Sequence, residues 1–294
     1  MRGAGNDPRL GERPVRGFEL PESLGGKLWF WRYIILRRVV QLLVLLLFVG
    51  TFRWGWSLAG SPVLRGNLSA SELLGFVPLA DPFAVLQLLL ARGAVASRVL
   101  IGASIVLLFY VVVGGRVFCS WVCPVNAVTD LAGWLRRRLG IRYTVRPPRA
   151  VRYWALGLAL LLSLLLGVAA FEWISPIGML HRELIFGWGL GWVAVAAVFV
   201  FDLLVVKHGW CGHLCPLGAF YGLFGGAAQV RIAYDATTCT QCGECAVVCP
   251  EPHVLDLKRA AETGMIASGD CTNCGRCTPV CPENSLRFGW RMRI

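Results

Sequence analysis

Two short cysteine runs near the carboxyl end constrain this chain more than any other feature. They read CTQCGECAVVCP (239–250) and CTNCGRCTPVCP (271–282), and each has the spacing C-x2-C-x2-C-x3-C-P. This spacing is typical of bacterial ferredoxins, in which three close thiolates hold one [4Fe–4S] cluster and the fourth cysteine binds the other. We therefore predict a crossed assignment. One cluster takes Cys239, Cys242, Cys245 and Cys281, and the other takes Cys271, Cys274, Cys277 and Cys249.

Residues inside the two runs support the same prediction. Gly243 and Gly275 let the backbone fold tightly around each cluster, while Pro250 and Pro282 fix the turn after the fourth cysteine. A zinc site would use two pairs of ligands, and a disulfide framework needs an oxidising compartment. Two complete runs in tandem therefore favour two [4Fe–4S] clusters.

The composition indicates a membrane protein. Hydrophobic residues make up 56% of the 294-residue chain, and the mean hydropathy is +0.61. These values are too apolar for a soluble domain of this length. The net charge of +12 does not indicate nucleic-acid binding, because the basic residues cluster beside the apolar segments.

We expect a helical membrane protein with four spans. Apolar runs predict spans over 39–52, 99–117, 153–171 and 188–206, and the segment 76–90, broken by Pro78 and Pro82, an interfacial or re-entrant piece. Residues 1–32 lack the apolar core and cleavage site of a signal peptide.

Arginine placement predicts the orientation of the spans. Arg32, Arg37 and Arg38 flank the first span, and seven arginines fall within 136–152, whereas the connection 172–187 has Arg182 as its only Lys or Arg. Basic flanks face the cytoplasm. We therefore expect a bacterial cytoplasmic (inner) membrane protein with a periplasmic 172–187 connection and cytoplasmic N- and C-termini.

A second cysteine motif, C-x3-C-P, occurs twice. Cys211 and Cys215 lie 92 residues after Cys119 and Cys123, and each motif follows two predicted spans. This is a duplication in parallel orientation. On a helix the i,i+4 spacing places both thiols on one face. The four cysteines could form a shared metal or iron–sulfur site, act as redox-active dithiols, or simply fill space as buried thiols.

These features divide the chain into five segments. They are a cytoplasmic tail (1–32), a first two-span repeat (33–135), a basic cytoplasmic loop (136–152), a second two-span repeat (153–228) and a ferredoxin-type domain with two [4Fe–4S] clusters (229–294).

Several cofactors lose support. The four histidines, at 181, 208, 213 and 253, fall outside the predicted spans, so we expect no haem in the membrane. No glycine-rich dinucleotide fingerprint is present, so we expect no nicotinamide cofactor.

Because the cysteines map to one side of the membrane, a lipid-soluble quinol is the expected substrate that links the two sides. Candidates for quinol or proton handling are Glu172, His181 and Arg182, although a charged loop is usually just solvated. Asp202 is a further candidate because intramembrane charge is costly, and pairing with Lys207 is its alternative role.

The chain resembles the NapH family, membrane-bound ferredoxin-type quinol dehydrogenase subunits of periplasmic nitrate reductase systems. The segments that carry the resemblance are CSWVCPVNAVTDLAGWLRRR (119–138), FDLLVVKHGWCGHLCPLGAFYG (201–222), VCPEPHVL (248–255), PLADPFAVLQ (78–87) and EWISPIGML (172–180). The likeness implies four transmembrane helices, two [4Fe–4S] clusters and paired C-x3-C-P motifs. It also implies partners: a periplasmic iron–sulfur protein, a multihaem (tetrahaem) cytochrome acting as quinol dehydrogenase, and a nitrate reductase.

Two functions therefore compete. The first is electron transfer from the quinol pool toward a periplasmic nitrate reductase. The alternative is a ferredoxin-type maturation factor that reduces a metal or a maturing enzyme, as in methylamine dehydrogenase or copper-oxidase assembly. The chain has only four Met and four His and no copper-binding tract, which disfavours the copper role.

Overall fold

The computed structural model describes residues 23–291 except 59, 142–144, 146 and 188. Most of the expected tail, Arg142 and Arg146 of the basic loop, and the first residue of the fourth expected span lie outside the described residues. The chain divides into two compact units. One contains the segments up to Val39, Tyr110–Trp121 and from Tyr221, and the other contains Val40–Phe109 and Val122–Phe220. The five segments expected from the sequence are each continuous in the chain, whereas each of the two units combines segments that are separated in the sequence.

Helix α1 (Leu24–Trp54) is longer than the first expected span. It begins inside the segment 1–32 that was expected to be a tail, and its 31 residues measure about 47 Å at ~1.5 Å per residue. Within the described part of the chain, it is the one helix both long and apolar enough to cross a membrane.

The helices at the other expected spans are shorter than those spans. They are α3 (Ser97–Val113), α6 (Ala150–Leu166) and α9 (Gly191–Leu204). Helix α6 stops at Gly167, which is left-handed with φ of 67°, and its 17 residues give about 26 Å against a bilayer core of ~30 Å. The left-handed glycine therefore ends this helix before the expected limit at residue 171.

Short antiparallel strands precede α2 in the second unit. Their bounds are β1 (Ser57–Leu58), β2 (Ser61–Pro62), β3 (Leu64–Gly66), β4 (Ala70–Leu73) and β5 (Val77–Ala80), paired β1-β2 and β3-β4-β5. Helix α2 (Pro82–Arg92) has Pro82 in its first turn, and Asp81 accepts the backbone amides of Phe83 and Ala84. The segment 76–90 thus forms a strand and a capped helix.

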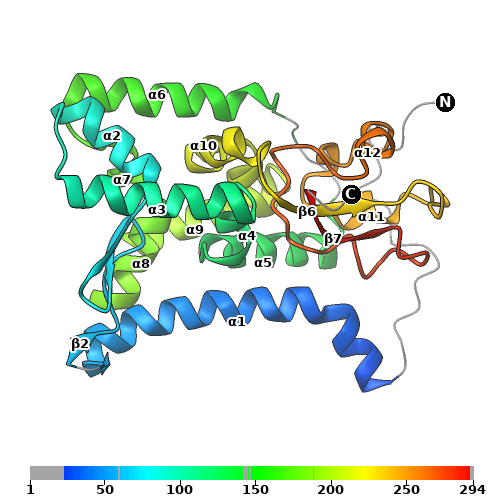
Figure 1. The fold of residues 1–294 in the computed structure, drawn as a ribbon, viewed down its shortest axis with the longest axis horizontal. Coiled ribbons are helices and arrows are strands. Elements are labelled where there is room, and N and C mark those ends of the chain that lie inside the picture. The colour runs from blue at the N-terminus through cyan, green and yellow to red at the C-terminus, as the bar shows by residue number, and fades with distance from the viewer. Residues whose placement is uncertain (1–22, 59, 142–144, 146, 188, 292–294) are drawn as a thin grey trace. The chain divides into compact units, whose positions relative to one another are not determined.

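A buried polar cluster joins α2, α6 and α7 (Ala170–Ile174). The Gln87 side-chain oxygen accepts hydrogen bonds from the Phe171 amide at 2.9 Å and the Ser163 hydroxyl at 3.3 Å. The Ser163 oxygen in turn accepts the Ala170 amide at 3.1 Å. Helix α2 packs on α6 (Figure 1), so these bonds fix the start of α7 against both helices.

The rest of the second unit contains α5 (Val125–Arg138), α8 (Pro176–Phe186), α9 and a π-helix (Trp210–Leu214). Helix α10 (Pro216–Gly225) begins in this unit, and its residues from Tyr221 belong to the first. Helix α5 packs against α9. Arg136 of α5 donates to the carbonyls of Asp202 and Leu203 at 3.2 and 3.1 Å. A cation thus satisfies the last turn of α9, where the helix dipole is negative.

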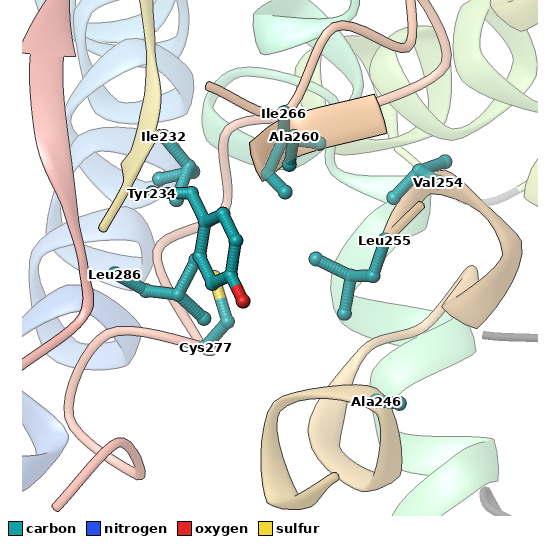
Figure 2. Packing of buried hydrophobic residues seen from close by; sticks show 9 residues of the cluster. All are labelled: Ile232, Tyr234, Ala246, Val254, Leu255, Ala260, Ile266, Cys277 and Leu286. Carbon is teal, nitrogen blue, oxygen red and sulfur yellow. The ribbon is translucent and has the colours of Figure 1, made fainter. Parts of the chain in front are cut away.

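The first unit is built on the antiparallel pair β6 (Val230–Tyr234) and β7 (Leu286–Trp290), which lie side by side in Figure 1. Its other elements are α4 (Val117–Trp121), α11 (Glu244–Val248), a 3-10 turn (Pro252–Val254) and α12 (Leu257–Thr263). Figure 2 shows Tyr234 and Leu255 turned toward one interior, with Leu286 beside Tyr234. Cysteines of both runs pack against this core, so one hydrophobic cluster supports both cysteine loops.

Candidate functional site

The two cysteine loops have left-handed residues at matching positions. Gln241 and Gly243 in the first loop have φ of 56° and 78°, and Asn273 and Gly275 in the second have φ of 49° and 72°. Alternating left-handed residues turn successive amides inward and make a concave site for an anion. Glycine accepts this conformation without strain, as the sequence predicts, whereas Gln241 and Asn273 were not anticipated.

Two cavities collect the eight cysteines. One is lined by Cys239, Cys242, Cys245 and Cys281, and the other by Cys249, Cys271, Cys274 and Cys277. In each cavity the fourth cysteine comes from the other run, which is the grouping that the crossed spacing predicts. Four thiols around one hollow suit an iron–sulfur cluster.

The two cavities differ in their access to solvent. Cys242 is exposed, whereas Cys274 and Cys277 are buried. None of the twelve cysteines, all of which the structure describes, takes part in a disulfide. Among the residues that the structure describes, no three His, Cys, Asp or Glu side chains are grouped to hold a single metal ion.

Helix α4 carries Cys119, and two of its side chains bind backbone carbonyls of the second cysteine loop. The Ser120 hydroxyl donates to the Thr272 carbonyl at 2.7 Å. The Trp121 indole N–H donates to the Asn273 carbonyl at 3.0 Å. Neighbouring carbonyls of the loop are therefore fixed from one short helix.

Arg116, just before α4, adds an ion pair to these two hydrogen bonds. The contacts made by Arg116, Ser120 and Trp121 are together called the clamp. Its guanidinium lies 2.7 Å from the Glu251 carboxylate and donates to the Asp270 carbonyl at 3.0 Å, and its side chain is 1% exposed. Burial raises the pKa of the nearby Cys119 thiol, and the Arg116 charge opposes that rise. Glu251 and Asp270 both line the second cavity, so Arg116 links the first C-x3-C-P motif to this cavity.

The expectation that each C-x3-C-P pair lies on one helix is wrong. Cys119 lies in α4, but Cys123 lies after that helix ends. Cys211 lies in the π-helix, and Cys215 is extended with ψ of 112°. The prolines explain this, because a residue that precedes proline is disfavoured in the α-helical region.

Asp202 holds the second motif rather than a substrate cavity. Its carboxylate accepts the Trp210 amide at 2.9 Å, and its side chain is fully buried. The Thr129 hydroxyl lies 3.9 Å from the Cys211 sulfur. Asp202 therefore acts as a cap for the π-helix that carries Cys211, and it does not line the cavity that contains the other acid and base candidates.

Glu172, His181 and Arg182, the other candidates for quinol or proton handling, do come together. They line a cavity of about 270 Å³ in the second unit. Burial raises the pKa of Glu172, against the opposing effects of the Ser69 hydroxyl and the Arg182 charge. Burial lowers the pKa of His181 to about 4, so its imidazole is neutral at pH 7.

Sequence reasoning missed part of the lining of this cavity. Asn67, Leu68 and Ser69, in the turn between β3 and β4, belong to it. The Ser69 hydroxyl donates to the Glu172 carboxylate at 2.5 Å across 103 residues of chain. The Asn67 side-chain oxygen accepts hydrogen bonds from the amides of Ser69 and Ala70. An Asn at this position indicates a turn but gives no sign of a site.

Two family models match the chain. A 4Fe-4S dicluster domain covers residues 238–285, which contain both cysteine runs. A 4Fe-4S binding domain covers residues 95–142 and 184–232, each of which contains one C-x3-C-P motif.

Curated relatives extend the match over most of the chain. The methylamine utilization ferredoxin-type protein MauN of Methylorubrum extorquens is 50% identical over 80% of this chain and 81% of its own. The ferredoxin-type proteins NapH of Haemophilus influenzae and Escherichia coli are 45% and 44% identical over 77% and 80% of this chain and 79% and 81% of their own. The chain belongs to the NapH and MauN family. It is thus a ferredoxin-type iron–sulfur electron-transfer protein, and no solved structure matches it.

Proposed function

We propose that the carboxyl-terminal unit binds two [4Fe–4S] clusters with crossed ligands. Cys239, Cys242, Cys245 and Cys281 would hold one, and Cys271, Cys274, Cys277 and Cys249 the other. The observation that carries this proposal is the division of the eight cysteines between two cavities in these two sets. When bound, each cluster would supply one-electron transfer.

A pair of matched variants tests the crossing. Cys249→Ser should impair the cluster bound by Cys271, Cys274 and Cys277, while Cys281→Ser should impair the cluster of the first run. Electron paramagnetic resonance of the reduced protein, with iron counted per chain, separates the two. If Cys249→Ser alters the first-run cluster instead, the ligands are not crossed.

The protein would sit in the cytoplasmic membrane with four spans and both termini inside. The arginine-rich flanks support this orientation, and α1 is long and apolar enough for one span. Helices α3, α6 and α9 would form the other three, with local bilayer thinning or flanking residues making up their length. Cysteine accessibility labelling of intact cells and of inverted vesicles tests each connection.

The function supported best is that of a quinol dehydrogenase component that delivers electrons toward a periplasmic nitrate reductase. Its partners would be a periplasmic iron–sulfur protein and a multihaem cytochrome. Quinol added to the purified protein with these partners should bleach the visible absorbance of the clusters. Absence of bleaching, when dithionite still bleaches them, would refute quinol oxidation by this protein.

One observation favours a second candidate function. MauN of Methylorubrum extorquens, whose printed name refers to methylamine utilization, has 50% identity to this chain. The protein would then serve as a reductant for a maturing methylamine-oxidising enzyme. Deletion of the gene separates the two roles. Loss of growth on methylamine would support the maturation role, and loss of nitrate respiration would support the quinol dehydrogenase role.

The four C-x3-C-P cysteines, Cys119, Cys123, Cys211 and Cys215, would take part in the same electron transfer. The 4Fe-4S model that matches the segment around each motif supports an iron–sulfur role. Redox-active dithiols are the alternative role, and an iron count for serine variants distinguishes the two.

A further inference from the structure

His181 is a buried polar side chain whose environment the fold alone does not explain. It is 1% exposed, and neither ring nitrogen has a hydrogen-bond partner among the described residues. Its ring packs edge-on against Phe48 of α1, with the centroids 4.6 Å apart. Leaving a buried polar group unpaired is costly. Because His181 also lines the 270 Å³ cavity, a molecule bound there would supply the missing partner.

The lining of the cavity also includes a carboxyl group that is held in place. Glu172 is held by the Ser69 hydroxyl at 2.5 Å. The turn that carries Ser69 is itself rigid, because Asn67 accepts two of its amides at 2.9 and 2.8 Å. The lining therefore contains a neutral imidazole and a carboxyl group that is held by a neighbouring hydroxyl.

The remaining lining narrows the class of ligand. Leu68 and Trp173 add apolar and aromatic surface. The volume lies just below the usual range of ~300–1,000 Å³ for ligand pockets, which suits a single ring. Glu172 disfavours an anionic ligand, and the exposed side chain of Arg182 is open to screening by solvent.

We propose that this cavity binds the ring head group of a quinol. His181 accepts a hydrogen bond from one ring hydroxyl, Glu172 accepts one from the other, and Trp173 packs on the ring. A quinol matches this lining because it is neutral and aromatic and carries two hydroxyl groups that can donate to the imidazole and to the carboxyl group. The assignment rests on the proposed quinol dehydrogenase function and adds the location of its substrate.

Binding of a quinol analogue tests the site on the full-length protein in detergent. Heptyl-hydroxyquinoline N-oxide is titrated, and its fluorescence quenching gives Kd. His181→Phe removes both ring nitrogens but keeps an aromatic ring against Phe48, and Glu172→Gln removes the carboxylate. Glu72→Gln is the matched control, because Glu72 is a half-exposed acid that faces Arg98 on the surface.

Each site variant should weaken binding by roughly tenfold or more, the loss expected for one hydrogen bond to a buried group, while the control binds as the wild type does. His181→Leu, which also removes both ring nitrogens, takes its place if the Phe variant does not fold, as judged by dithionite-reducible cluster absorbance. Unchanged Kd values in the site variants overturn this location but leave quinol oxidation standing. If the wild type binds no analogue and quinol fails to bleach the clusters, both the site and the proposed function fail.

Discussion

Replacing Arg116 tests whether the clamp on the second cysteine loop is electrostatic. The Arg116 and Glu251 side chains are 1% and 9% exposed and lie 2.7 Å apart. Arg116→Met leaves the Glu251 carboxylate buried without its cation, and breaking a buried pair in this way costs about 3–5 kcal/mol. The lost bond to the Asp270 carbonyl is part of that cost. We expect the free energy of unfolding of the first unit to fall by about 3–5 kcal/mol.

The assay is denaturant titration followed by visible cluster absorbance, on single and double variants. Arg116→Met combined with Glu251→Gln should be less destabilised than Arg116→Met alone, since no uncompensated charge remains. Arg98→Met is the matched control. Its partner Glu72 lies 3.8 Å away, and the two side chains are 61% and 42% exposed, so the cost should stay within about 1 kcal/mol.

Two results would refute this reasoning. One is a loss for Arg116→Met no greater than that for Arg98→Met. The other is strict additivity of the two buried substitutions, because a coupling energy near zero would mean that Arg116 acts through packing alone.

Three further predictions follow from single residues. Gly275→Ala should lower the iron content per chain, because φ is +72° and the new Cβ would lie 2.7 Å from Tyr33, whereas Gly140→Ala, with φ of +65° and open space, should not. Burial lowers the pKa of His181 from 6.5 to about 4. The stability is therefore complete above pH 6.5, and roughly 3 kcal/mol of it is lost as the pH falls from 6.5 to about 4, because only the unfolded state binds the proton in this range. His181→Phe should remove this part of the acid sensitivity in pH-dependent unfolding. Cys119→Ser with Cys211→Ser should lower the iron count if these cysteines hold a cluster, whereas an unchanged count would leave the dithiol role.

The cysteine spacing predicts two crossed sets of four cysteines, and the two cavities are lined by these sets. The same spacing did not predict the left-handed conformations of Gln241 and Asn273, because these residue types adopt many conformations. For C-x3-C-P, the i,i+4 rule failed at Cys123 and Cys215. There the following proline, visible in the sequence, competes with helix continuation.

The polar cavity was predicted only in part. Glu172, His181 and Arg182 are close in sequence and lie on neighbouring helices, so a charged connection between two apolar runs was enough to select them. Ser69 comes from a turn 103 residues earlier, and no local pattern links it to Glu172. Asp202 was selected for the cost of burying its charge, and the Trp210 amide, which donates to its carboxylate, only reduces that cost.

The clamp between α4 and the second cysteine loop has a consequence for biogenesis. Trp121 and its acceptor Asn273 are separated by 152 residues, and at ~5–20 residues per second the ribosome needs roughly 8–30 s to make the second partner after the first. During that time residues 122–220 emerge, and they are the second of the two segments that make up the other unit. Helix α4 therefore lacks its contacts with Thr272 and Asn273 until the carboxyl-terminal part of the chain has been synthesised. The first unit is thus the last of the two to complete its folding.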